Sequence, residues 1–215
     1  LVGFDCLNVS YMVACLFRSW KYFCACVEFF SLKSQKIQCV HFWKLILLGR
    51  ILGSLLYGVS PHRKQIAKAN IELCFPYKNE QEVLYLLKEH FKNIGIGIFE
   101  LSIAWWSSKK AIKNLKVCTK NLEVLKNIDK DRGVLILIKH TTHVELDVRL
   151  MAEEMKLGGM YKSQSNEVMN YLMIRARNRY ITGAINNHQA RKGIYWINNG
   201  HKFIYAADQD YGKKS

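Results

Sequence analysis

The stretch Arg132–Leu150, RGVLILIKHTTHVELDVRL, decides the fold of this chain. It contains an unbroken apolar run at 134–138, rich in β-branched residues and preceded by a glycine, which predicts a strand buried on both faces. A polar segment at 139–142 follows, and a helical pattern begins after it. A buried strand that leads into a helix indicates an α/β fold, in which chemistry tends to lie at the carboxyl ends of the strands.

His140 stands at the end of this predicted strand, and Glu145 falls in the first turn of the predicted helix. A carboxylate at that place can accept the N–H of the imidazole, which leaves the other ring nitrogen free to take a proton from a substrate hydroxyl. The spacing alone is a weak signal, because short motifs also occur by chance. His143 and Asp147 form a competing pair at helical i, i+4 spacing.

A second buried strand is predicted over Lys202–Ala207, and it ends in Asp208 and Asp210. Parallel strands joined by helices bring their carboxyl ends to one edge of the sheet. Both acidic residues are therefore expected in one groove with His140, where they would either stabilise its imidazolium form or bind the hydroxyls of a substrate. The alternative is a turn with side-chain caps, which Asp and Gly favour.

The composition limits the possible partners. The 215 residues suggest one domain with or without an appendage, and half of them are hydrophobic, enough for a core. The net charge of +15 favours a phospholipid surface, a nucleic acid or an acidic protein. The basic residues show no zinc-finger spacing and no RNA-binding signature, so a membrane or a phosphorylated lipid fits better than nucleic acid.

Cysteine usage bears on the compartment. The chain has seven cysteines, an odd number without the spacing of a disulfide framework. The cysteines are therefore interpreted as reduced thiols, which indicates that the soluble part of the protein faces the cytoplasm.

The first 59 residues have a different character from the rest. Residues 1–36 form an uncertain N-terminal extension whose apolar runs are interrupted by charges. Residues 37–59 predict a membrane-anchor helix, since 23 residues are enough to span a bilayer core of about 30 Å. Lys44 and Arg50 weaken this prediction, and the alternative is a buried helix of a soluble protein. The basic cluster after Pro61 favours the cytoplasmic side.

Residues 60–215 are predicted to form one domain, with a helical part at 60–110 and an α/β core at 111–215. In the helical part, Arg63–Leu73 predicts an amphipathic helix with a cationic face. Asn79 is the expected N-cap of a second helix that continues to the paired tryptophans at 105–106.

Smaller features complete the expected structure. Gly95 and Gly97 indicate close helix packing or a break. The α/β core is expected to contain a short strand at 115–118, helices at 121–128 and 144–155, a turn at Gly158–Gly159, and a basic helix at 168–180.

Four segments together resemble one family. They are RKQIAKANIELCFP at 63–76, FELSIAWW at 99–106, GVLILIKHTTHVEL at 133–146 and DQDYG at 208–212. From about Trp43 to Gly212 the chain resembles the late acyltransferases of lipid A biosynthesis. The resemblance implies a glycerolipid acyltransferase-like α/β fold, with a mostly parallel sheet flanked by helices and an N-terminal membrane-anchor helix. Family members continue well past the DQDYG signature, so it also implies that a C-terminal part is missing here.

The resemblance further implies the chemistry. A fatty acyl chain would pass from acyl carrier protein to a hydroxyl of a lipid A precursor, at an anionic membrane, with no cofactor, no metal and no nucleic acid. The H-x4-D/E motif of the family makes His140 the general base and Glu145 its orienting partner. Substrate binding is expected from Tyr161, Lys162, Arg177, Arg179, Asp208 and Asp210. The location implied is the bacterial inner membrane, with the catalytic domain facing the cytoplasm.

Some features of the sequence separate the alternatives. Lys162 stands where the family usually has an arginine, which keeps the charge but loses bidentate geometry. No Ser or Cys lies beside His140 as a nucleophile, so direct transfer is preferred to an acyl-enzyme.

Two alternatives stay open: a related membrane acyltransferase with another glycolipid or a glycerol-phosphate acceptor, and an inactive truncated relative that only binds membranes. The DQDYG signature favours lipid A over glycerol-phosphate.

Overall fold

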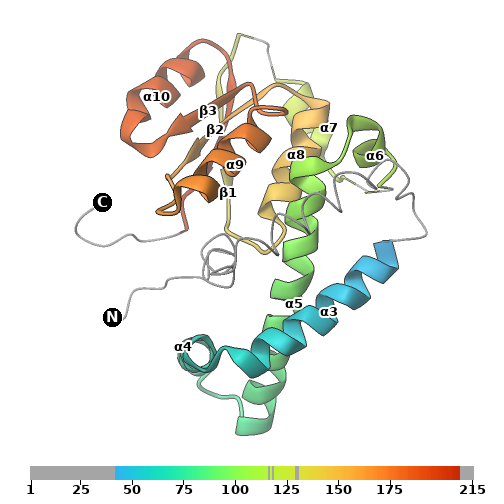
Figure 1. Ribbon diagram of the computed structural model, residues 1–215. Helices are drawn as coiled ribbons and strands as arrows, with labels where there is room; N and C mark the ends of the chain where they lie inside the picture. The colour runs from blue at the N-terminus through green and yellow to red at the C-terminus, as the bar shows by residue number, and fades with distance from the viewer. Residues whose placement is uncertain (1–41, 116, 118, 129–130, 209–215) are drawn as a thin grey trace.

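The computed structural model describes residues 42–115, 117, 119–128 and 131–208 (Figure 1). The helices are α3 (Phe42–Val59), α4 (Pro61–Cys74), α5 (Glu80–Trp106), α6 (Lys109–Lys113), α7 (Leu122–Lys126), α8 (Val144–Glu154), α9 (Glu167–Arg177), the 3-10 helix η3 (Asn187–Gln189) and α10 (Ala190–Asn198). The strands are β1 (Val134–Ile138), β2 (Leu157–Tyr161), β3 (Gly183–Asn186) and β4 (Lys202–Ala206). The predicted extension at 1–36 and the first residues of the predicted anchor lie outside the described residues, and the predicted domain bounds stay predictions.

The four strands form one sheet in the order β1-β4-β2-β3, and all the pairs are parallel. Right-handed crossovers place α8 and α9 on one face and α10, which returns the chain from β3 to β4, on the other (Figure 1). The predicted parallel sheet flanked by helices is therefore confirmed. The two strands predicted from apolar runs are β1 and β4, which lie side by side with Ile138 opposite Ala206.

The position of β1 differs from the prediction. β1 is an edge strand of the described sheet, and Leu135 and Leu137 are 48% and 66% exposed. The prediction that this strand is buried on both faces is wrong for the described part of the chain. An apolar run predicts a strand, but the neighbouring elements alone decide which faces are covered.

Two further predictions for the core are wrong. Gly158 and Gly159 lie inside β2 and do not form a turn. A Cβ atom on Gly158 would lie 2.8 Å from the ring of Trp196 in α10, and one on Gly183 of β3 would lie 2.6 Å from that ring. The glycines thus let the indole lie directly on the sheet. The strand predicted at 115–118 is not formed at Leu115 or at residue 117, the two positions of that segment that the structure describes.

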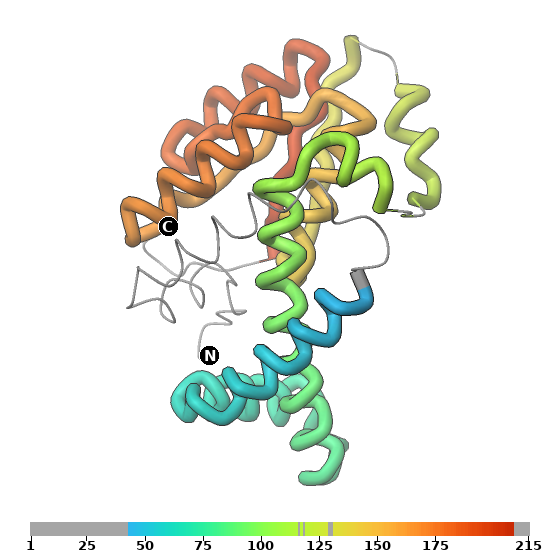
Figure 2. Tube along the Cα trace, turned by 45° about the vertical axis from the view of Figure 1, so that its right-hand side comes forward, coloured from blue at the N-terminus to red at the C-terminus, as the bar shows by residue number. Residues whose placement is uncertain are grey.

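Helix α5 begins with the predicted cap. The Asn79 side chain accepts the backbone N–H of Glu82 at 3.0 Å, and the Glu82 carboxylate accepts that of Asn79 at 3.0 Å, which makes a capping box. The helix then continues without a break to Trp106 and joins the two parts of the molecule (Figures 1 and 2). Along its length it packs on α3, α4, α8 and α9.

The glycines on α5 and α3 serve close packing, as predicted for Gly95. A Cβ atom on Gly95 would overlap the backbone of Gly49 and of Gly53 in α3. A Cβ atom on Gly53 would overlap the carbonyl oxygen of Phe91 and lie 2.5 Å from Cα of Lys92. The backbones of the two helices therefore touch where they cross.

We expect Gly53→Ala to lower the free energy of unfolding by about 1–3 kcal/mol, because the added methyl group forces the two helices apart. Gly58→Ala is the matched control in the same helix, since a Cβ atom there meets nothing within 4 Å. It should be neutral or slightly stabilising, as Gly is unfavourable inside a helix. Urea unfolding monitored by circular dichroism measures both variants, and equal midpoints would contradict the close crossing.

Membrane-span criteria are not met by any single helix among the described residues, but α3 and α4 meet them together across a bend of 100° at Ser60. The membrane-anchor helix over 37–59 stays a prediction.

Candidate active site

The carboxyl ends of β1 and β4 bring His140 and Asp208 into contact. The two strands pair in register, and each of these residues follows its strand by two positions. His140 Nδ1 lies 2.6 Å from Asp208 Oδ1, and the backbone N–H of His140 donates to Oδ2 at 2.7 Å. Both carboxylate oxygens therefore hold the same residue, and the expectation that His140 and Asp208 meet at one edge of the sheet is confirmed.

This contact sets the chemistry of the histidine. A carboxylate accepts only, so Nδ1 carries the proton and Nε2 is the nitrogen that accepts one. Partial burial works to raise the pKa of Asp208, but the hydrogen bonds from the ring and the backbone of His140 outweigh it and lower the pKa. Asp208 is therefore ionised at neutral pH, and its negative charge lies beside the His140 ring.

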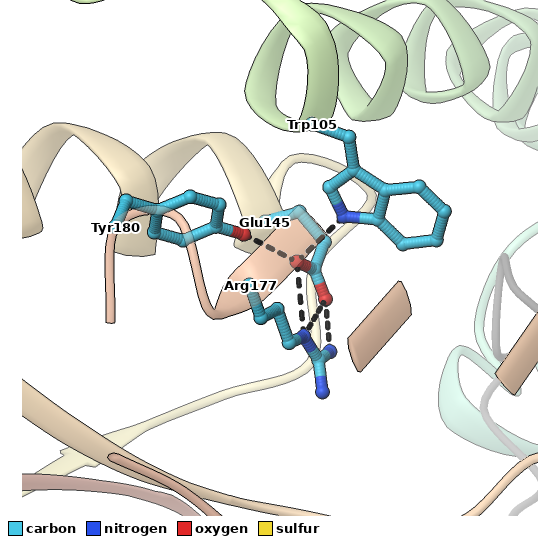
Figure 3. A network of polar contacts seen from close by, with 4 residues as sticks. All are labelled: Trp105, Glu145, Arg177 and Tyr180. Atoms are coloured by element: carbon cyan, nitrogen blue, oxygen red, sulfur yellow. Dashed lines mark hydrogen bonds and ion pairs between the residues drawn. The ribbon is translucent and has the colours of Figure 1, made fainter. Parts of the chain in front are cut away.

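Glu145 has other partners than the predicted one (Figure 3). Its carboxylate accepts the indole N–H of Trp105 at 3.0 Å and the hydroxyl of Tyr180 at 3.2 Å. Arg177 donates to it from Nε at 3.1 Å and forms a second, short contact from its terminal nitrogen. The expected contact between Glu145 and His140 is thus corrected, because Glu145 faces α5 and α9 while His140 faces Asp208.

The surroundings of Glu145 keep it charged although it is nearly enclosed. Its side chain is 12% exposed, and that of Arg177 is 20% exposed. Burial alone would raise the pKa of Glu145, but the charge of Arg177 and the hydrogen bonds from its three partners hold the pKa below its ordinary value. This ion pair joins α8 to α9, and the indole adds α5, so Glu145 connects three helices.

The Tyr180 ring extends this network. Its hydroxyl donates to Glu145, and burial followed by the neighbouring carboxylate charge raises the pKa of the phenol, which therefore stays protonated. The Arg149 guanidinium lies 4.8 Å from the centroid of the ring and pairs with Glu153 at 2.7 Å. Neither side chain of that ion pair is more than 7% exposed. These contacts fix Tyr180 against the partners of Glu145.

The competing histidine also has its predicted partner. His143 Nδ1 lies 2.6 Å from Asp147 Oδ2, and both side chains are half exposed. A cavity of the described part of the chain is lined by His140 and not by His143. The pair on β1 and β4 is therefore better placed to meet a substrate than the pair on α8.

A cavity of about 940 Å³ opens beside His140. Apolar side chains line much of it, including those of Ile138, Val148, Met173, Ile181 and Ile204. The polar groups in its wall come from His140, Glu145, Tyr161, Lys162 and Arg177 among others. An apolar cavity with a few convergent polar groups is typical of a site that binds a small molecule.

Apart from Asp208, which holds His140, the predicted substrate-binding residues divide into three groups. Tyr161 and Lys162 line the cavity as a substrate-binding role requires. Arg177 also lines it, but its guanidinium is held by Glu145, and Arg179 donates to the backbone carbonyl of Trp105 at 3.1 Å. The structure thus engages both arginines in contacts within the protein. Asp210 lies outside the described residues.

The network around Glu145 contains three residues that the sequence did not identify as part of a site: Trp105, Tyr180 and Arg149. Buried Trp and Tyr need a partner for their N–H or O–H, which is the one signal that could have linked them to a buried carboxylate. Within the described part of the chain, no three His, Cys, Asp or Glu side chains gather closely enough to hold a metal ion.

The chain is similar to several known proteins. The profile of the family described as "Bacterial lipid A biosynthesis acyltransferase" matches residues 34–215. The chain is 29% identical over 172 residues to the lipid A biosynthesis palmitoleoyltransferase of Escherichia coli (strain K12), covering 79% of this chain and 56% of that protein. It is 31% identical over 184 residues to a lipid A biosynthesis acyltransferase of Haemophilus influenzae, covering 84% and 58%. It is 28% identical over 170 residues to the lauroyltransferase of the same E. coli strain, covering 78% and 55%. The chain therefore spans about half the length of the curated relatives it matches.

Proposed function

The chain belongs to the bacterial lipid A biosynthesis acyltransferase family, and from this premise we propose that it transfers a fatty acyl chain to a hydroxyl of a lipid A precursor. The observation that carries the proposal is the contact of His140 with Asp208 beside an apolar cavity. The proposed donor of the acyl chain is acyl carrier protein, which holds the chain as a thioester. The relatives are named for different acyl chains at similar identities, so the proposal extends to a fatty acyl group and not to its length.

The proposed reaction needs a base because the acceptor hydroxyl is protonated at neutral pH. Nε2 of His140 takes that proton as the hydroxyl oxygen attacks the thioester carbonyl. Asp208 stabilises the imidazolium that forms, in the manner of an orienting carboxylate. When the tetrahedral intermediate collapses, the C–S bond breaks and His140 returns the proton to the leaving thiolate. The products are the ester and the free thiol of the carrier protein.

The other cavity residues suit the proposed substrates. Lys162 supplies a positive charge and Tyr161 a hydroxyl near His140, which fits a phosphorylated sugar, while the apolar wall fits an acyl chain. Glu145 is assigned a positioning role, since it holds α8, the helix that follows the His140 loop, against α5 and α9. The charge of +15 fits an acidic carrier protein and the anionic, cytoplasmic face of the bacterial inner membrane, where we propose the enzyme works.

The test is to incubate the purified protein with acyl-acyl carrier protein and a lipid A precursor, and to follow thiol release and the mass of the lipid product. We expect the precursor to gain one acyl chain. Parallel reactions with glycerol 3-phosphate and with a mannolipid examine the alternative acceptors. Acylation of either of these, and not of the lipid A precursor, would replace the proposed acceptor, and no acylation of any would favour a membrane-binding relative.

The role of Asp208 gives a separate prediction. Because its carboxylate holds the ring and the backbone of His140, Asp208→Asn should weaken the base in every reaction. We expect thiol release to fall at least about 100-fold both with the acceptor and, as slow hydrolysis, without it. The matched control is Asp147→Asn, which removes the same charge from the exposed pair with His143 and should leave both rates nearly unchanged. If hydrolysis survived in Asp208→Asn while acylation fell, Asp208 would position the acceptor, as the sequence alone suggested.

A further inference from the structure

Helix α3 has an exposed face that is largely apolar, and its other exposed residues are Lys44, Ser54 and Gly58. Its exposed large side chains are Trp43 (77%), Leu47 (60%), Leu48 (50%), Ile51 (51%), Leu55 (62%) and Val59 (71%). The i, i+3, i+4 spacing of these residues puts them on one side of the helix along its whole length. A row of this size is unusual on a soluble surface and marks an interaction site.

The opposite face of α3 is locked against α5. Gly49 and Gly53 lie in backbone contact with α5, and Leu45 and Leu56 are buried. Figures 1 and 2 both show α3 crossing α5 at the end of the molecule away from the sheet. The apolar row therefore faces outward, and α3 cannot turn it inward without breaking the glycine contacts.

Charges at the crossing decide how α3 can meet a lipid bilayer. Arg50 of α3 pairs with Glu89 of α5 at 3.2 Å, and Lys92 pairs with the same carboxylate at 2.6 Å. If α3 crossed the bilayer while it remained packed on α5, these three side chains would enter the hydrocarbon. Charged groups at that depth are costly. A helix that lies along the surface keeps them in the polar layer.

The charges near α3 match an anionic surface. Residues 42–75 contain five basic residues and one acidic residue: Lys44, Arg50, Arg63, Lys64 and Lys68 against Glu72. Helices with an apolar face and basic neighbours bind in the plane of the interface, with the apolar side about 5–10 Å deep.

From these observations we infer that α3 is an in-plane membrane-contact helix, whose row Trp43–Val59 enters one leaflet of an anionic bilayer without crossing it. The contact does not depend on the proposed reaction. His90 of α5 lines the same cavity as His140, and the next residue, Phe91, meets Gly53 of α3 through its carbonyl oxygen.

The test of the contact is flotation of the whole chain with vesicles of phosphatidylethanolamine and phosphatidylglycerol, without donor or acceptor. We expect wild type to float, and the double variant Leu47→Glu/Leu55→Glu to bind about 100-fold more weakly, since two apolar side chains are replaced by charges. The matched control is Tyr171→Glu/Tyr195→Glu on α9 and α10. These residues are 58% and 68% exposed, similar to Leu47 and Leu55, so the control adds the same charge at similar exposure away from α3. It should bind like wild type.

The orientation is tested on the bound protein with a membrane-impermeant amine reagent, followed by peptide mass spectrometry. Lys44 and Lys64 flank most of α3, so both should be labelled from outside the vesicles at similar rates. Protection of either lysine until the vesicles are lysed would mean that α3 crosses the bilayer and would overturn the inference. So would wild-type binding by the Leu47→Glu/Leu55→Glu variant, or equal loss in the control. None of these results bears on acyl transfer, which is assayed separately.

Discussion

His140→Ala is expected to lower acyl transfer by about 1,000-fold while the protein keeps its fold. A general base contributes about 100- to 10,000-fold to such a reaction, and the His140 ring is the base that Asp208 orients beside the cavity. The ring is 27% exposed, so its loss creates little empty space in the core. Thiol release and lipid product measure the rate, and circular dichroism with thermal melting measures the fold.

His143→Ala is the matched control for this prediction. It removes the same side chain three positions along, and it breaks a histidine–aspartate contact of the same length, 2.6 Å. We expect its activity to stay within a few-fold of wild type, because His143 does not line the cavity. An inactive His143→Ala together with an active His140→Ala would transfer the role of base to the second pair.

The second large effect is expected at Glu145. Its replacement by Ala leaves the guanidinium of Arg177 enclosed without a counter-charge, and also leaves Trp105 and Tyr180 without their acceptor. Breaking a buried ion pair by removing one partner costs about 3–5 kcal/mol. We therefore expect Glu145→Ala to lower the free energy of unfolding by that amount, as measured by urea unfolding, with activity falling as the helices lose their arrangement.

Two controls distinguish a structural role of Glu145 from a direct role in catalysis. Glu154→Ala breaks the ion pair with Lys126, in which both side chains are about half exposed, and it should cost no more than about 1 kcal/mol. The double variant Glu145→Leu/Arg177→Leu removes both buried charges and should recover part of the lost stability. If Glu145→Ala unfolded like wild type yet was inactive, Glu145 would act on the reaction itself.

The pH dependence follows from the same ion pair. The pKa of Glu145 is lowered in the folded protein, so its contribution to stability is fully present above the ordinary glutamate value of about 4.3. The contribution is lost as the pH falls below that value and through the lowered pKa. Wild type should therefore lose more stability than Glu145→Ala between neutral pH and the acid range. Parallel unfolding curves of the two proteins across that range would contradict a charged Glu145.

The sequence by itself determined the features that depend on short stretches of chain, and those that follow from the common direction of parallel strands. The apolar runs predicted β1 and β4, and Asn79 with the acidic residues after it predicted the start of α5. The meeting of His140 and Asp208 also followed, because two parallel strands end at the same edge of a sheet wherever they lie in the chain. Resemblance to the family rested on four ordered motifs and was confirmed by the family profile.

Only the tertiary structure decided the partners of side chains that several elements compete for. Spacing showed that Glu145 could reach His140, but in the folded chain its carboxylate binds Trp105 of α5 and Arg177 of α9. The burial of β1 and the outward face of α3 likewise depend on which neighbours pack against them. A sequence fixes the periodicity of each helix and strand along its own axis, whereas the rotation of one element against the next is set by contacts between residues far apart in the chain.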